Sequence, residues 1–202
     1  MPRSGSRKQL LWTHLAFARR REYTKRYAKP VRERKKIKLI TLRLTKDLLK
    51  DMKTTSIEDI NVPPLLSWHV NIYNLNKRKH IVFVNDLTRL SVIIDGIRTG
   101  QLERLKEKFL VTLREYLLRE GVKENLVNTY LQFGAEVVLS KTNSRSVLGT
   151  MKEVTFFIED DFNDNIERLK WLNRLIHKPI DYKEPVDFFK ESIKDHSNYN
   201  TV

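Results

Sequence analysis

Two stretches of this 202-residue chain carry polar side chains whose types could support chemistry. The first holds His69 and Asn71, with Arg78 soon after them, and the second holds Asn143 and Arg145. Imidazole titrates near neutral pH, so His69 could act as an acid or base in a cleavage reaction, or bind a phosphate together with Arg145. The alternative, which we favour, is that these groups satisfy the backbone at strand ends and that Asn143 caps a helix.

No other pattern in the sequence indicates catalysis or a bound cofactor. The chain has no glycine-rich phosphate loop, no nucleophile elbow and no zinc-protease helix. None of its histidines stands at metal-ligand spacing from another; they occupy positions 14, 69, 80, 177 and 196. The acidic run at 159–161, with Asp164, could bind a divalent ion, but consecutive acids at a helix end are usually solvated. We therefore expect no metal and no cofactor.

Positive charge is concentrated at the N-terminus. The formal net charge is +14, and residues 1–38 hold 14 Lys and Arg against 2 Glu, whereas the rest of the chain holds 25 against 23. Such a segment favours a polyanionic partner, because the counterions that it releases supply binding free energy without a shaped pocket. Nucleic acid, DNA or RNA, is the first candidate, and an anionic membrane surface is the second.

The basic segment has helical spacing over residues 7–28 and ends near Pro30. Trp12, Tyr23 and Tyr27 are interleaved with its charges, so they could stack on bases or on a partner, or dock the helix on the rest of the protein. A solvated basic extension is the simpler alternative. The residues that we expect to contact nucleic acid are Arg7, Lys8, Trp12, Arg19, Arg20, Arg21, Tyr23, Lys25, Arg26, Tyr27, Arg32, Arg34, Lys35 and Lys36.

Hydrophobic spacing predicts the elements that position the polar residues. Residues 67–73 alternate apolar and polar side chains, 81–84 are apolar on both faces, and 90–94 follow a short turn, which together predict three consecutive strands. The turn between the first two strands is expected at 76–79. After Gly96 the spacing becomes helical, and the longest helix is expected over 101–119, with Phe109 and Phe83 in the core.

The remaining elements complete the predicted fold. Strands are expected at 37–44 and 136–140, and helices at 45–49, 124–133, 144–158 and 164–176, the last with Ile176 facing inward. We therefore predict an α+β fold with a mainly antiparallel sheet built on a three-stranded meander, packed by helices, with a basic N-terminal helical arm.

Two runs, 66–88 and 140–151, resemble an uncharacterised bacterial family of small α+β domains, known only as a domain of unknown function. The resemblance covers about residues 37–158 and implies an α+β fold. It implies no biochemistry. The basic arm and the segment after Asn163 are expected to be additions to the family domain.

We expect three parts: a basic arm at 1–36 that binds nucleic acid or a partner, an α+β domain at 37–178, and a C-terminal tail at 179–202. The chain has no cysteine, which favours a reducing cytoplasm, and no apolar run of about 20 residues that could span a bilayer. Edge strands and a nearly charge-balanced domain predict a homodimer.

Three functions are compatible with these features. The first is a non-enzymatic accessory protein that binds nucleic acid or a nucleoprotein through its arm, as a dimeric helper in a bacterial mobile-element or antiviral system built on an RNA-guided nuclease. The second is a small RNA-cleaving or nucleotide-modifying enzyme that uses His69 and Arg145. The third is a ribosome- or membrane-surface-associated protein that uses the same arm.

Overall fold

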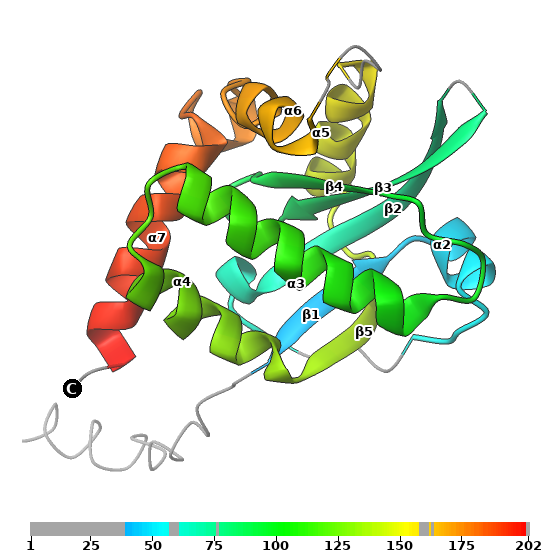
Figure 1. The fold of residues 1–202 in the computed structure, drawn as a ribbon, viewed down its shortest axis with the longest axis horizontal. Helices are drawn as coiled ribbons and strands as arrows, with labels where there is room; N and C mark the ends of the chain where they lie inside the picture. The colour runs from blue at the N-terminus through cyan, green and yellow to red at the C-terminus, as the bar shows by residue number, and fades with distance from the viewer. Residues whose placement is uncertain (1–38, 57–60, 76, 158–161, 163, 201–202) are drawn as a thin grey trace, which may run out of the picture. The chain divides into compact units, whose positions relative to one another are not determined.

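The computed structural model describes residues 39–56, 61–75, 77–157, 162 and 164–200 (Figure 1). Within these residues it forms one five-stranded sheet with α-helices packed on it. The helix expected over 7–28 lies outside the described residues. No helix in the described part of the chain combines the length and the apolar character needed to cross a membrane.

The sheet has the strand order β4-β3-β2-β1-β5. Strands β2 (Ser67–Leu75), β3 (Arg78–Asn85) and β4 (Ser91–Asp95) pair antiparallel, so the predicted meander is confirmed. Strand β1 (Ile40–Leu44) pairs parallel with both β2 and β5 (Val137–Lys141). The predicted α+β class is confirmed, and the sheet is mixed, with its antiparallel pairings confined to the meander.

The parallel pairings require crossover connections, since a tight hairpin can join only antiparallel strands. Helix α2 (Lys46–Asp51) and the short 3-10 helix η1 (Pro64–Leu66) lie between β1 and β2. Helices α3 (Leu102–Arg119) and α4 (Glu124–Leu131), followed by η2 (Gln132–Ala135), lie between β4 and β5. Helix α3 matches the predicted longest helix, and Gly121 follows it with φ +78°.

The apolar face of the sheet carries the main core. Phe83 of β3 stacks on Phe109 of α3 with ring centroids 4.3 Å apart, and both side chains are fully buried, as predicted. Trp68 of β2 meets Phe109 edge-on at 5.1 Å, and its indole Nε1 donates a hydrogen bond to the hydroxyl of Tyr130 in α4. Helices α3 and α4 therefore cover this face together.

The C-terminal segment contributes to the same core. Helix α7 (Pro185–Asn200) buries Val186, Phe189 and Ile193, and the Phe189 ring lies 6.0 Å from that of Trp68. The segment that we expected as a tail is thus packed against the sheet through its apolar side chains.

The opposite face of the sheet is more polar and is covered by α5 (Arg145–Phe156), while α6 (Asn165–Leu172) packs beside β4 and α3. Figure 1 shows α5 on the other side of the meander from α3 and α4. The prediction that Ile176 faces inward is wrong, because α6 ends at Leu172 and the Ile176 side chain is 58% exposed.

Candidate functional site

His69 lies at the centre of a buried polar network on the face covered by α5. Its side chain has no exposed surface. Its Nδ1 lies 2.5 Å from Oδ1 of Asp86, and its Nε2 accepts hydrogen bonds from the backbone N–H groups of Asn143 and Ser144, each at 3.3 Å. Because Nε2 accepts hydrogen bonds, Nδ1 carries the proton, and the Nδ1–H group donates a hydrogen bond to the Asp86 carboxylate. Both ring nitrogens are therefore engaged.

Asp86 links His69 to other buried groups. Its Oδ2 accepts a hydrogen bond from Ser67 Oγ at 2.6 Å and lies 3.5 Å from the Nε of Arg43. Arg43 is 5% exposed, and its Nε donates to Ser67 Oγ at 2.8 Å. Arg89 donates to the main-chain oxygen of Asp86. A buried arginine is stable only when paired, so this network joins β1, β2, the β3–β4 turn and the start of α5.

These contacts support the structural interpretation of His69. A general acid or base must reach the substrate, directly or through one water, and His69 is enclosed. Arg145 lies in the first turn of α5 with its side chain exposed, and it makes no hydrogen bond to His69 among the described contacts. Ser144, rather than Asn143, caps α5 by accepting from the Val147 N–H.

The predicted polar residues do not form one site. The structure brings His69 and the backbone of Asn143 together, whereas Asn71 accepts from the Thr45 hydroxyl at 2.7 Å and from the Ile72 N–H. Arg78 lines a separate pocket. Arg78 is also not in the turn predicted at 76–79, because it is the first residue of β3.

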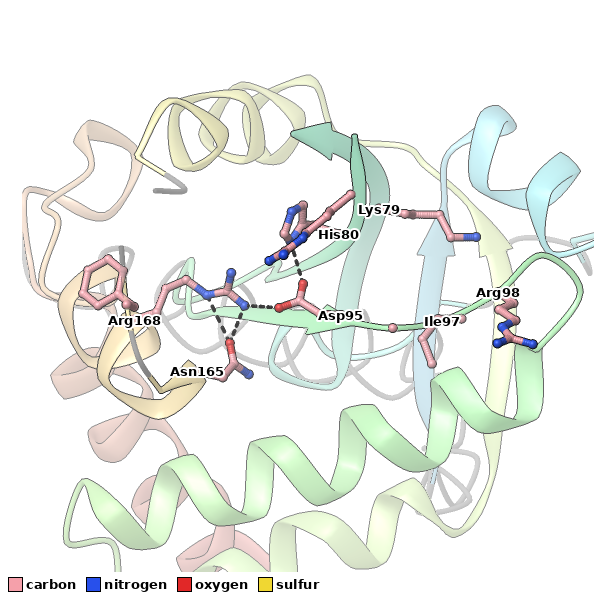
Figure 2. Close-up of a pocket in the computed structure, with 10 residues that line it drawn as sticks. Lys79, His80, Asp95, Ile97, Arg98, Asn165 and Arg168 are labelled. Atoms are coloured by element: carbon pink, nitrogen blue, oxygen red, sulfur yellow. Dashed lines mark hydrogen bonds and ion pairs between the residues drawn. The ribbon is translucent and has the colours of Figure 1, made fainter. Parts of the chain in front are cut away.

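The pocket that Arg78 lines, called the basic pocket below, has a volume of about 590 Å³. It lies where β3 and β4 meet the start of α6 and the loop before α3 (Figure 2). Its lining is rich in cationic side chains, with a single carboxylate. The lining residues are Arg78, Lys79, His80, Asp95, Gly96, Ile97, Arg98, Phe162, Asn165 and Arg168.

Asp95 holds one end of this pocket in place. Its Oδ1 forms a hydrogen bond with His80 Nδ1 at 2.6 Å, and its Oδ2 accepts a hydrogen bond from Arg168 Nη2, also at 2.6 Å (Figure 2). Arg168 also donates to the side-chain oxygen of Asn165 through Nε and Nη2. His80 is 3% exposed and Arg168 is 6% exposed, so the guanidinium has a fixed orientation.

The other cations lie nearer the surface. Lys79 pairs with Asp51 of α2 at 2.7 Å, and Asp51 also accepts from the Thr99 hydroxyl. Arg78 and Arg98 are exposed, and neither guanidinium makes an ion pair with any described residue. The pocket therefore offers positive charge that the described part of the protein does not neutralise.

Two further predictions concern residues that the structure does not describe. The basic arm at 1–36, including all the residues expected to contact nucleic acid, lies outside the described residues, as does the acidic run at 159–161. Within the described ranges, no group of three or more His, Cys, Asp or Glu side chains could hold a metal ion.

Comparison with known families gives one match. The model of DUF6933, a domain of unknown function, matches residues 41–188, which is most of the chain. The chain belongs to the DUF6933 family. No curated protein matches the sequence.

The extent of the DUF6933 match corrects one expectation. The match continues through α6 to residue 188 in the first turn of α7, so residues 164–188 are part of the family domain and not an addition to it, whereas residues 189–202 follow the match. The ten residues of the basic pocket and the network around His69 both lie inside the DUF6933 match, whereas the basic arm at 1–36 precedes it.

Proposed function

We propose that this DUF6933 protein is a non-enzymatic accessory protein that binds nucleic acid, or a nucleoprotein, through its basic arm at 1–36. The observation that carries the proposal is the distribution of charge, with 14 Lys and Arg against 2 Glu in residues 1–38 and near balance in the rest. A segment of that composition gains affinity for any phosphate backbone by releasing counterions.

The described domain supports a binding role over the enzymatic alternative. His69, the residue on which cleavage would depend, is buried with both nitrogens hydrogen-bonded. The setting that we propose is the bacterial cytoplasm. There the protein serves as a helper of a mobile-element or antiviral RNA-guided nuclease system, and it strengthens the binding of the nuclease to DNA or RNA.

We further propose that the protein acts as a homodimer. Strand β5 lies at one edge of the sheet, and an edge strand can pair with the same strand of a second copy. Light scattering at tens of micromolar, roughly the range suited to an ordinary interface, should give twice the monomer mass. A monomer mass would contradict this part of the proposal.

The nucleic-acid part is tested by titrating the intact protein, and a version that lacks residues 1–36, against duplex DNA, single-stranded DNA and structured RNA. We expect the intact protein to bind with little sequence preference and the truncated protein to bind duplex DNA far more weakly. Equal duplex affinities would show that the arm is not the nucleic-acid contact.

A further inference from the structure

The basic pocket contains cations at both of its ends. Figure 2 shows Arg168 beside Asp95 at one end and Arg98 beyond Ile97 at the other. The successive phosphates of a nucleic-acid strand can engage several such cations in turn, and a guanidinium group can bind a phosphate through two parallel hydrogen bonds.

The cations differ in how they are held. Arg168 is oriented by Asp95 and Asn165, and its Nη1 makes no hydrogen bond with any described residue, so this nitrogen remains able to donate. Arg78 and Arg98 are exposed and unpaired among the described residues. Charge-assisted bonds from guanidinium to phosphate oxygens are among the stronger hydrogen bonds that proteins make.

Aromatic side chains continue the surface from the pocket. Phe162 lines the pocket, and its ring centroid lies 5.9 Å from that of Trp171 in α6, which in turn lies 5.8 Å from that of Phe157 at the end of α5. Trp171 is 40% exposed and Phe157 is 42% exposed. Large aromatic rings that remain accessible beside cations are the pattern on which unpaired bases stack.

We propose that the pocket and the aromatic residues Phe157, Phe162 and Trp171 together bind a segment of single-stranded nucleic acid, with the strand phosphates on Arg78, Arg98 and Arg168 and its bases against the aromatic rings. This proposal rests on the proposed nucleic-acid-binding function, but it uses none of the residues of the arm. It specifies the form of nucleic acid, because the bases of a duplex are paired and stacked on one another and cannot reach the rings.

The test uses the full-length protein and a fluorescent single-stranded DNA of about 12 nucleotides, a length within the range of known single-strand sites, together with the matching duplex. The pocket variant is R78Q/R98Q. Its control is R119Q/K123Q, which removes the same charge from exposed positions outside the pocket. We expect the pocket variant to lower single-strand affinity about tenfold or more relative to the control, and to leave duplex affinity equal to that of the control.

Salt dependence separates the two kinds of contact. Each phosphate contact on a single strand contributes about 0.7 to the slope of log affinity against log salt, so R78Q/R98Q should flatten the slope by roughly 1.4 units. Trp171→Ala should lower single-strand affinity at every salt concentration without changing the slope, because an aromatic ring releases no counterions. Thermal melting should confirm that all variants are folded, since the substituted side chains are exposed or half-buried.

The results distinguish this inference from the function on which it rests. If R78Q/R98Q binds the single strand as tightly as R119Q/K123Q does, the pocket inference is overturned, whatever the arm does. If the arm variant R19Q/R20Q/R21Q keeps its duplex affinity while R78Q/R98Q loses the single strand, the pocket inference holds and the arm is excluded as the contact.

Discussion

Asn173, the residue that follows α6 as its C-cap, hydrogen-bonds to both backbone groups of Ser91 in β4. Its Oδ1 accepts the Ser91 N–H at 2.6 Å, and its Nδ2 donates to the Ser91 carbonyl oxygen at 2.9 Å. Asn165 adds a third bond, from Nδ2 to the carbonyl oxygen of Ile93. Side chains of α6 and of its C-cap residue thus bond to the backbone of β4, one of the two edge strands of the sheet, and occupy part of that edge.

Asn173→Ala should therefore destabilise the domain strongly. The substitution removes the side-chain hydrogen bonds to the buried N–H and C=O groups of Ser91. Because each unsatisfied buried group costs about 1–3 kcal/mol, we expect the free energy of unfolding to fall by about 2–4 kcal/mol. Chemical denaturation measures this loss. Asn128→Ala, at an exposed position of α4, should change stability by no more than about 0.5 kcal/mol. Equal effects of the two substitutions would show that the Ser91 bonds are not structural.

Phe83→Ala and Phe109→Ala should each cost about 3–5 kcal/mol, because each ring is fully buried and stacked on the other. The double variant should lose less than the sum of the single losses, since the stacking contact can be lost only once. Val111→Ala is the control on α3, where the side chain is 65% exposed. Thermal melts that do not differ from that control would remove these residues from the core.

Glu120 gives the domain a pH-dependent contact. Burial alone would raise the pKa of its carboxyl, but hydrogen bonds and charge from Arg174, together with Lys190, lower the pKa below its ordinary value. Arg174 contacts it through both Nη1 and Nη2, at 2.9 and 3.0 Å. A carboxyl whose pKa is lower in the folded state stabilises the protein above its unfolded pKa, and this stabilisation is lost as the pH falls through the folded value.

Glu120→Gln should accordingly cost about 1 kcal/mol at pH 7, a modest value because Arg174 is 47% exposed. The difference from the wild type should shrink once the pH falls below about 4.3, the ordinary pKa of a glutamate. Denaturant titrations of both proteins between neutral and acidic pH measure this difference. A constant difference across that range would indicate packing rather than charge.

The contribution of the basic arm to DNA binding should be measurable from the salt dependence of the affinity. If Arg19, Arg20 and Arg21 each contact a phosphate of duplex DNA, replacing all three by Ala should weaken binding to every sequence alike. It should also flatten the slope of log affinity against log salt by up to about 3 units. Unchanged affinity and slope would favour a protein partner or surface association.

The aromatic residues of the arm have two possible roles that one pair of measurements separates. If Trp12, Tyr23 or Tyr27 stacks on bases or on a partner, its replacement by Ala lowers affinity and leaves the melting temperature unchanged. If it docks the arm on the domain, the melting temperature falls.

Much of the fold was predictable from local spacing, and the rest depended on distant contacts. The meander followed from alternation around Trp68 and Phe83, whereas nothing in the pattern of 40–44 indicates that this strand pairs parallel on both sides. Phe189 was visible as an apolar residue, but only tertiary structure shows that it meets Trp68. The prediction that the helix continues to Ile176 was wrong because the helical spacing of apolar residues does not show where a helix ends.

The candidate site was harder to predict than the fold. His80 and Asp95 are cross-strand partners, so the register of the meander could have paired them. Arg168 reaches Asp95 from 73 positions away, and no sequence spacing signals such a contact. His69 was recognised as a chemically capable residue, but its enclosure by Asp86 and the start of α5 depends on parallel pairings that the sequence does not disclose.

The double parallel pairing of β1 has a consequence for folding during synthesis. Arg43 of β1 contacts Ser140 of β5, 97 positions later in the chain, so β1 keeps one side unpaired until most of the protein has left the ribosome. Such non-local pairings form late and leave a strand exposed to other chains in the meantime. The basic arm precedes β1 directly in the sequence, so its charge accompanies the unpaired strand through this interval. The repulsion between two nascent copies would then protect that strand from premature association.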